Sequence, residues 1–374
     1  MGRKRLGKDP AAALRALDNH PNNLFISSVS RCLGSLEQLY ASGLDVYLSA
    51  EKYGIRKRLR APIPVISVGN LSVGGTGKTP ATIAIARALQ EMGVKVVVIS
   101  RGHGGTASRA GGIVSDQLGN ILLTTKESGD EPMVLAIALP RIPVIVGKDR
   151  RKSALKAVEL FKPDVLLLDD GFQYWQLHRD VDIVLLDGTR PFDNGHCLPR
   201  GLLREPKRNL CRAHIVIISR SGDLTSGKKE ELNKEINNLA PSANIYYSRH
   251  AATHCVASNA AAEKLKVPIK PLAVCAIARP DSFFETLQAA GVSAVGEIVF
   301  PDHFNYAAPD AARIIGKMHA LHAESLVTTQ KDFVKLGALL PDAPVFVQAI
   351  DFEIENALNL FSELFDRAML PGKL

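Results

Sequence analysis

Short, uninterrupted apolar runs recur along this chain, separated by segments that are glycine-rich or carry apolar residues at helical spacing. The runs lie at residues 63–68, 94–99, 142–146, 165–168, 181–186 and 214–218. Strands that are buried on both faces of a parallel sheet have this continuous apolar character. The alternation therefore predicts an α/β fold with a mainly parallel sheet covered by helices, whose ligands gather at the carboxyl ends of the strands.

The pattern breaks once and then restarts. Residues 241–256 contain short β-prone pieces, such as Ile245-Tyr246-Tyr247, which indicate a connection between two units. A smaller α/β unit is predicted beyond it, with strands at 272–277, 295–300, 325–328 and 345–350 and helices at 280–290 and 308–322. Because a chain of 374 residues exceeds the size at which a single core usually stops growing, we expect two domains.

The N-terminal part differs from the rest. Residues 1–24 are polar and read as a tail, and residues 24–48 carry an apolar stripe at helical spacing: Ile26, Val29, Leu33, Leu36, Tyr40, Leu44 and Tyr47. Charged residues interrupt the stripe, so it lacks the ~20 apolar residues of a spanning helix. A basic cluster follows: Lys52, Arg56, Lys57, Arg58 and Arg60. Such a helix can lie on an anionic membrane leaflet or pack on its own domain, and this stretch leaves both open.

The net charge and the cysteines indicate the kind of partner and the compartment. The net charge of +8 indicates an acidic partner, which can be a nucleotide, a nucleic acid or an anionic membrane surface. The five cysteines show no C-x-x-C spacing, so neither a disulfide framework nor a zinc site is indicated, and a reducing, cytoplasmic compartment fits best. We expect no secretory signal, because the basic start is followed by polar sequence.

A glycine-rich stretch between a predicted strand and a helical pattern at 81–92 predicts a nucleoside triphosphate site. It reads Ser72, Val73, Gly74, Gly75, Thr76, Gly77, Lys78 and Thr79. Backbone N–H groups can converge on phosphate oxygens, Lys78 can neutralise the β/γ charge, and the Thr79 hydroxyl can ligate magnesium. The usual pattern begins with glycine where this chain has Ser72, so we expect Gly74 and Gly75 to supply the permissive dihedrals. The alternative is a glycine-rich hairpin beside a surface lysine.

Two predicted strands end in carboxylates. Asp169 and Asp170 follow one of them and Asp187 follows the next, and either could hold the magnesium ion of a phosphate-loop enzyme. The pair is the stronger candidate, because adjacent carboxylates repel each other unless a cation or a donor compensates. Capping of the following turn is the alternative, more so for Asp187.

Further polar segments are ambiguous on their own. The long loop at 188–207 is rich in glycine, proline and basic residues, and its Arg200 and Arg204 could clamp phosphates. Three polar clusters lie at 129–132, 301–306 and 328–332. Taken one at a time, such clusters are more typical of turns than of catalytic sites.

Seven motifs taken in order are more specific. They are the stretch 68–80 with the phosphate loop, Ser-Arg-Gly at 100–102, Gly-Asp-Glu-Pro at 129–132, Leu-Asp-Asp-Gly-Phe-Gln at 168–173, Leu-Arg-Glu-Pro at 203–206, Phe-Pro-Asp-His at 300–303 and Lys-Asp at 331–332. This ordered set resembles the tetraacyldisaccharide 4'-kinases, which phosphorylate the lipid A precursor in Gram-negative bacteria. The resemblance covers about residues 33–350, and it accounts for Ser72, because the phosphate loop of that family does not begin with the usual glycine.

The resemblance implies two α/β/α sandwich domains, the first a P-loop NTPase with a mainly parallel sheet, joined by a short β linker. The implied boundaries are 1–24 for a tail, 25–60 for an amphipathic membrane-associated helix and basic cluster, 61–243 for the nucleoside triphosphate-binding domain, 244–260 for the linker and 261–374 for a smaller domain that closes the cleft. It also implies a peripheral or monotopic protein at the cytoplasmic face of the bacterial inner membrane. Neither a nucleic acid nor a protein partner is expected.

The implied reaction is ATP-dependent phosphorylation of the 4'-hydroxyl of tetraacyldisaccharide 1-phosphate, with Mg²⁺. Ser72 to Thr79 would bind ATP, and Asp169 and Asp170 would serve the metal and the phosphates. Asp130 would accept the hydroxyl proton, oriented by His303 across the cleft. The remaining implied contacts are Asn70, Arg101, Glu131 and Arg204 for the substrate, and Thr79, Asp170, Gln173 and Glu205 for the metal.

Three segments depart from the family pattern. The family usually has Tyr where this chain has His103, and His followed by basic residues where it has Tyr174-Trp175-Gln176. Arg200 and Leu202 stand where the family tends to have Ala and Pro. These changes concern details of substrate contact and leave the phosphate loop, the Asp169/Asp170 pair and the Asp130/His303 pair intact.

One hypothesis from a different class is a membrane-associated P-loop regulatory or partitioning ATPase that transfers phosphate to water alone. It explains the loop, the Asp pair and the amphipathic helix equally well. It gives no reason for Asp130 and His303, and the sequence lacks the guanine-specific Asn-Lys-x-Asp, which makes a GTPase less favoured.

Overall fold

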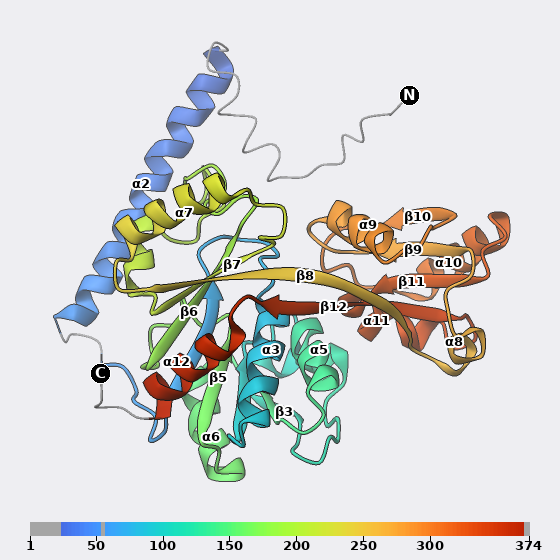
Figure 1. The fold of residues 1–374 in the computed structure, drawn as a ribbon, viewed down its shortest axis with the longest axis horizontal. Helices are drawn as coiled ribbons and strands as arrows, with labels where there is room; N and C mark the ends of the chain where they lie inside the picture. Colours follow the sequence, from blue (N-terminus) through green and yellow to red (C-terminus); the bar gives the residue numbers. More distant parts are fainter. Residues whose placement is uncertain (1–23, 54–56, 370–374) are drawn as a thin grey trace.

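The computed structural model describes residues 24–53 and 57–369, and within them one 12-stranded sheet runs through both parts of the molecule (Figure 1). The strands are β1 (Val65–Asn70), β2 (Val96–Ser100), β3 (Gly112–Ser115), β4 (Val144–Val146), β5 (Val165–Asp169), β6 (Val181–Asp187), β7 (Ile215–Ser219), β8 (Asn244–Ala257), β9 (Pro271–Cys275), β10 (Gly296–Val299), β11 (Ser325–Thr329) and β12 (Val345–Ile354). Their order in the sheet is β10-β9-β11-β12-β8-β7-β6-β1-β5-β2-β4-β3.

The larger unit, residues 57–243, contains the parallel sheet that the apolar runs predict. Strands β7, β6, β1, β5, β2 and β4 are parallel neighbours, and β3 closes the edge antiparallel to β4. Every residue of β1, β2, β5, β6 and β7 is buried, as expected for strands covered on both faces. The main helices are α3 (Lys78–Glu91), α5 (Asp130–Ala138), α6 (Arg150–Phe161) and α7 (Ser226–Leu239). The carboxyl ends of β1, β5 and β6 therefore meet at one edge.

The smaller unit, residues 261–354, has its own parallel strands β9, β10 and β11, with β12 beside β11. Helices α9 (Pro280–Ala289), α10 (Ala308–Ala320) and α11 (Gln330–Leu336) accompany them. A separate core forms here around Val274, Ile298, Ile314 and Leu326. The predicted strands and helices of this unit are confirmed, with ends that differ by a few residues.

The connection between the units is one long strand instead of short pieces. The first residues of β8 pair parallel with β7, and the rest of β8 pairs antiparallel with β12. Figure 1 shows this two-stranded ribbon passing between the units. A sequence window could not reveal it, because the partner that makes β8 a strand lies about a hundred residues further along the chain.

The C-terminal helix returns to the larger unit. In α12 (Ala357–Met369), Leu360, Leu364 and Ala368 are buried in the same core as Ile66 and Ile183 of the central strands. The predicted boundary groups this helix with the smaller domain, whereas its apolar face packs on the larger one. The surface that this helix covers depends on strands far from it in the chain.

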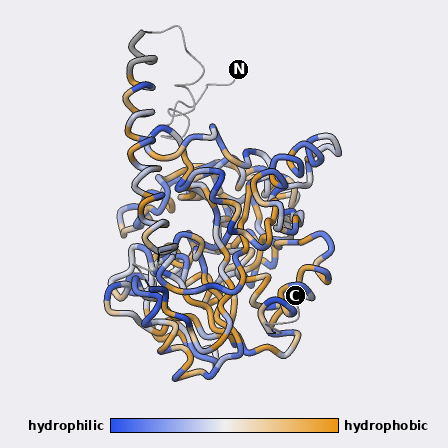
Figure 2. The backbone as a smooth tube through the Cα atoms, turned by 90° about the vertical axis from the view of Figure 1, so that its left-hand side faces the viewer, coloured by the Kyte–Doolittle hydropathy of each residue, from blue (hydrophilic) through white to orange (hydrophobic). Residues whose placement is uncertain are grey.

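The predicted N-terminal helix is confirmed as α2 (Leu24–Lys52), whose first turns extend past the body of the protein (Figures 1 and 2). One face packs on the larger unit, while Leu36, Leu39 and Val46 remain 51%, 71% and 70% exposed. In the part of the chain that the structure describes, no helix is both long and apolar enough to cross a bilayer. The predicted tail up to residue 23 and Arg56 of the basic cluster lie outside the described residues.

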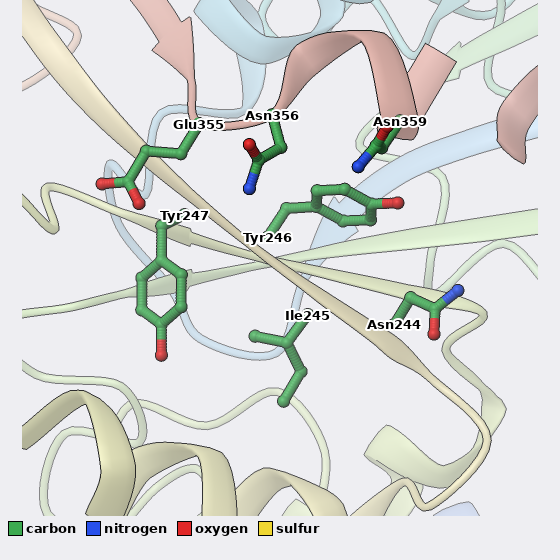
Figure 3. Close-up of a pocket in the computed structure, with 7 residues that line it drawn as sticks. All are labelled: Asn244, Ile245, Tyr246, Tyr247, Glu355, Asn356 and Asn359. Carbon is green, nitrogen blue, oxygen red and sulfur yellow. The ribbon is translucent and has the colours of Figure 1, made fainter. Parts of the chain in front are cut away.

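A shallow pocket of about 300 Å³ lies where the connecting ribbon leaves the larger unit (Figure 3). It is lined by Asn244, Ile245, Tyr246, Tyr247, Glu355, Asn356 and Asn359. Outside it, the Tyr246 hydroxyl donates to Glu363 and the Tyr247 hydroxyl to Asn233, so both phenols fix the ribbon to flanking helices. None of the predicted site residues lines this pocket.

Gly69 in β1 allows a close approach that a larger residue would prevent. A Cβ added there would lie 2.5 Å from the Phe172 Cβ and 2.8 Å from the Phe172 backbone nitrogen, in the turn that follows Asp170. We expect Gly69→Ala to lower the free energy of unfolding by about 1–3 kcal/mol, because that turn must move away from β1. Urea unfolding measures the change. Gly316→Ala in α10, where an added Cβ meets no atom within 4 Å, is the control and should not destabilise the protein.

Candidate active site

The phosphate loop lies between β1 and α3, as predicted. Gly74 and Gly77 have φ values of 111° and 88°, so these two positions need the freedom of glycine. The prediction for Gly74 is confirmed, but the second permissive position is Gly77 instead of Gly75. Asn70 is fully buried, and its amide nitrogen donates to the Ser72 carbonyl at 2.7 Å and to the Thr76 hydroxyl at 2.9 Å. The Asn70 amide nitrogen therefore shapes the loop from within, and the substrate contact expected of Asn70 stays a prediction.

The long loop at 188–207 is fastened to the phosphate loop. Ser72 and Leu203 form an antiparallel bridge, the Val73 N–H donates to the Leu202 carbonyl at 2.7 Å, and the Arg204 N–H donates to the Leu71 carbonyl at 2.7 Å. This pairing places the Arg204 side chain beside the end of β5. Backbone hydrogen bonds therefore hold this loop beside the predicted nucleotide site.

Asp170 is the carboxylate that faces the phosphate loop lysine. Its oxygens lie 3.7 Å from Lys78 Nζ and 2.9 Å from Arg204 Nη1. Its backbone is left-handed, with φ of 52°, a conformation that points the side chain out of the strand direction. Burial opposes its ionisation, but the charges of Lys78 and Arg204 outweigh burial and lower the pKa of Asp170 to about 2.

Asp169 has the opposite environment. Its side chain is buried, and its oxygens accept from the Thr82 and Ser100 hydroxyls, each at 3.2 Å. Burial raises the pKa of Asp169, and the nearby carboxylates of Glu131 and Asp170 raise it further. A cation placed beside Asp169 would favour its ionised form.

These residues fit a magnesium ion that is shared with a nucleotide. Hydroxyl and carboxylate oxygens, here from Thr79, Asp169 and Asp170, are the ligands that Mg²⁺ prefers. Among the described residues, no three His, Cys, Asp or Glu side chains group so as to hold a metal by themselves.

Gln173 and Glu205, predicted around the ion, have other partners. The buried Glu205 carboxylate accepts from Gln173, Asn209 and Arg212, each at 2.9 Å, and Gln173 also donates to the Asn70 carbonyl at 2.8 Å. The Arg212 guanidinium lies 3.6 Å from the centre of the Trp175 ring. These bonds let Glu205 support the loop that carries Arg204, and Trp175, one of the departures from the family pattern, packs on Arg212 in the same cluster. The metal contacts expected of Gln173 and Glu205 stay predictions.

Asp130 and His303 come together from the two units, as the hypothesis requires. His303 Nδ1 lies 3.4 Å from Asp130 Oδ2. Asp130 begins α5 after Gly129, and His303 has a left-handed backbone with φ of 57° in the loop after β10. Such strain is often found at functional positions. The His103 ring, which replaces the usual Tyr, lies 6.2 Å from the His303 ring.

Two charged residues of the site were missed by the sequence analysis. Arg150 begins α6, is 3% exposed, and donates to the Asp170 carbonyl at 2.8 Å. Lys335 of α11 donates to Asp130 Oδ2 at 2.8 Å from the other unit. Burial favours the neutral form of Asp130, but His303 and Lys335 outweigh it and lower the pKa of Asp130. The predicted substrate residues Arg101 and Glu131 flank this region, exposed and half-buried respectively.

Asp187, the other candidate metal ligand, has hydrogen-bond and ion-pair partners within the protein. Its carboxylate is buried, accepts from the Thr189 N–H and hydroxyl, and pairs with both Arg220 and Arg279. Arg220 also donates to the Gly75 carbonyl of the phosphate loop at 3.1 Å, while Arg279 belongs to the smaller unit. Asp187 therefore joins the phosphate loop to the smaller unit instead of facing a metal.

We expect Arg279→Ala to lower kcat/KM for ATP by about 3- to 10-fold, the size of a typical coupling between neighbouring charges. The reason is that Asp187 loses its partner from the smaller unit and Arg220 alone holds the phosphate loop to it. Initial rates at varied ATP concentration measure the effect. Arg109→Ala, on an exposed loop of the larger unit, is the matched control, and equal rates for the two variants would contradict the expectation.

Comparisons with known proteins agree on one family. The family model described as tetraacyldisaccharide-1-P 4'-kinase matches residues 29–368. A tetraacyldisaccharide 4'-kinase of Geobacter sulfurreducens is 38% identical over 87% of this chain and 90% of its own length, and one of Syntrophobacter fumaroxidans is 36% identical over 97% and 96%.

A solved structure has the same arrangement. The crystal structure of the kinase LpxK from Aquifex aeolicus in complex with ATP superposes with a TM-score of 0.73, at 27% identity, over 91% of this chain and 99% of that one. Its match includes both units and the ribbon between them, because nearly all of each chain is covered. By sequence and by structure, this chain belongs to the tetraacyldisaccharide 4'-kinase family.

Proposed function

We propose that this chain transfers the γ-phosphoryl group of ATP to the 4'-hydroxyl of tetraacyldisaccharide 1-phosphate, the reaction for which its relatives are named. The observation that carries the proposal is the meeting of Asp130 and His303 from different units, 3.4 Å apart, in a chain with a complete phosphate loop. In a kinase, such a pair can accept the proton of the acceptor hydroxyl when the two units come together. The regulatory ATPase hypothesis leaves it unexplained.

The chain's own groups supply most of the chemistry. The loop from Ser72 to Thr79 would cradle the phosphates, with Lys78 at the start of α3 neutralising their charge. Arg204 and Arg150, which both contact Asp170, add positive charge beside the transferred group. A bound Mg²⁺, held by Thr79 and the Asp169/Asp170 pair, would neutralise charge that develops on the β- and γ-phosphates.

The proton of the acceptor hydroxyl goes to the Asp130/His303 dyad. The hypothesis from the sequence makes Asp130 the acceptor, and positioning then counts for more than basicity, because the proton leaves as the P–O bond forms. One observation favours the reverse order: Lys335 and His303 both contact Oδ2 of Asp130, and His303 is the more exposed side chain, at 44% against 15%. In that order Asp130 orients the ring, and the imidazole takes the proton at Nε2 once the substrate hydroxyl has displaced the Lys331 ammonium that contacts this nitrogen at 3.1 Å.

We propose further that α2 lies on the cytoplasmic face of the inner membrane. Its exposed Leu36, Leu39 and Val46 support this, as do the exposed Lys57 and Arg58 that follow it. The packed face of α2 contacts the loop at 188–207. There the Tyr40 hydroxyl donates to the Arg204 carbonyl at 2.8 Å, and Glu37 accepts from the Cys197 N–H at 2.7 Å.

The test is direct. Purified protein is incubated with magnesium, γ-labelled ATP and detergent-solubilised tetraacyldisaccharide 1-phosphate, and the lipid is separated from free phosphate. Label in the lipid, dependent on the acceptor, supports the proposal. Release of inorganic phosphate at the same rate with and without the lipid, and no label in the lipid, would establish the ATPase hypothesis instead.

A further inference from the structure

Helix α11 of the smaller unit reaches the Asp130 carboxylate of the larger one. Lys335 Nζ lies 2.8 Å from Asp130 Oδ2 and 2.7 Å from the Phe304 carbonyl, and its side chain is 8% exposed. The Thr125 hydroxyl donates to the Val334 carbonyl at 2.9 Å, which fixes the backbone of α11 against the turn before Asp130. The ammonium group is thus held between both units, with little freedom to move elsewhere.

A second lysine of α11, Lys331, lies one turn earlier and contacts His303, the other member of the dyad. Lys331 Nζ lies 3.1 Å from His303 Nε2 and 2.9 Å from Asp302 Oδ1. An ammonium group only donates, so Nε2 accepts, and the ring proton must then be on Nδ1, which faces Asp130. This contact selects the tautomer of His303 in which Nδ1–H donates to the carboxylate.

We propose that Lys335 and Lys331 are positioning residues for the Asp130/His303 dyad: Lys335 holds the carboxylate ionised and fixed, and Lys331 fixes the imidazole tautomer. The inference rests on the proposed function, which gives the dyad its role. It also gives a role to the Lys331-Asp332 motif, which takes no part in the proposed reaction itself. Asp332 of that motif is fully buried and accepts from Tyr306, Thr329 and the Ala276 N–H, so it anchors α11 within its own unit.

The charged surroundings of Asp130 explain why a lysine is needed. The groups that face the dyad are Lys335, His103, Tyr306 and, through His303, Lys331 and Asp302. Burial raises the pKa of Asp130, whereas first the hydrogen bond with His303 and then the hydrogen bond and charge of Lys335 lower it. Lys335 is thus one of the two neighbours that favour the ionised carboxylate. A neutral side chain of similar length would fill the same space without this effect.

The experiment compares Lys335→Met, Lys335→Arg and a control, Lys317→Met. Lys317 contacts the Glu297 carbonyl at 2.8 Å on the far helix of the same unit, so its loss removes a lysine without touching the dyad. For Lys335→Met we expect kcat for lipid phosphorylation to fall by about 10- to 100-fold with KM for ATP within about 3-fold of wild type. Lys335→Arg, which restores the charge, should recover part of kcat.

A second measurement separates positioning from packing. Carboxyl-labelled aspartate, with the Asp130 signal assigned by its loss in Asp130→Asn, reports the pKa of Asp130 by NMR. Removal of a neighbouring opposite charge should raise that pKa by about 1–3 pH units in Lys335→Met and leave it unchanged in Lys317→Met. The same titration, with thermal unfolding as a check of folding, works without any lipid.

The outcomes are distinct. An Asp130 pKa and a kcat both unchanged in Lys335→Met would overturn the inference, as would a loss of kcat that Lys335→Arg does not relieve and that no pKa change accompanies. If wild-type protein labels no lipid, the proposed function fails. The NMR titration still decides whether Lys335 controls the carboxylate.

Discussion

Lys78→Met is expected to lower kcat by about 100- to 1,000-fold, the usual cost of removing one group that stabilises developing charge in a transition state. Lys78 is the first residue of α3, directly after the left-handed Gly77 of the proposed phosphate loop. Lys78 is the only lysine in the sequence from Ser72 to Thr79, so no neighbouring lysine in the loop can replace it. Rates of lipid labelling at saturating ATP measure the loss, and equilibrium binding of an ATP analogue shows whether the loop still holds nucleotide.

The control for this variant is Lys95→Met, an exposed lysine just before β2. The double variant with Asp170→Asn adds information, because Lys78 Nζ lies 3.7 Å from the Asp170 carboxylate. Residues in one charge network rarely act independently, so the two losses should not multiply. A Lys78→Met protein that retains a third or more of the wild-type kcat would remove Lys78 from the catalytic machinery.

Local segments of the site could be predicted from sequence because all their parts are adjacent in the chain. Strand β1, the glycine loop and α3 follow one another directly, so hydropathy and glycine spacing describe them well. The same holds for Asp169 and Asp170 at the end of β5. The conformational details followed only from the structure: glycine spacing alone did not show that Gly77 needs a positive φ and Gly75 does not.

The two strand-end acids illustrate a limit. In sequence, Asp170 and Asp187 have the same setting, an apolar strand followed by Asp-Gly. In the structure, Asp170 meets Lys78 and Arg204, whereas Asp187 meets Arg220 and Arg279. Their roles are set by guanidinium and ammonium groups from distant segments, which no local pattern encodes.

Long-range pairs account for the remaining omissions. Lys335 and Asp130 are 205 residues apart in the chain, and Arg150 and Asp170 are 20 apart on different elements. The long strand β8 and the packing of α12 on the larger unit depend likewise on partners far along the sequence. Resemblance to a family supplied Asp130 and His303 as a pair, but composition and spacing alone would not have joined them.

Asp130→Asn is expected to lower kcat by about 100- to 10,000-fold, the range for removing a positioned acid or base, while ATP binding stays near the wild-type value. The amide keeps the shape of the side chain but loses the charge that pairs with Lys335 and His303. Asp281→Asn is the matched control, because Asp281 is an exposed aspartate in the first turn of α9, outside this cluster. Unimpaired phosphoryl transfer by Asp130→Asn would show that the base is elsewhere.

His303→Gln and the double variant then test whether the two residues act as a unit. If they do, the double variant should lose no more than the worse single variant, because removing either partner already disables the dyad. Independent contributions would instead multiply, and would mean that the 3.4 Å contact between Nδ1 and Oδ2 is not the catalytic one.

The pH profile of kcat/KM decides which member of the dyad takes the proton. The structure lowers the pKa of Asp130, so the ionised carboxylate persists as pH falls through the usual range of aspartate near 3.9. If Asp130 is the acceptor, activity in wild-type protein should therefore decline only below about pH 4. A decline at a pH clearly above the aspartate range would show that Asp130 is not the acceptor, and its loss in His303→Gln would assign the proton to His303.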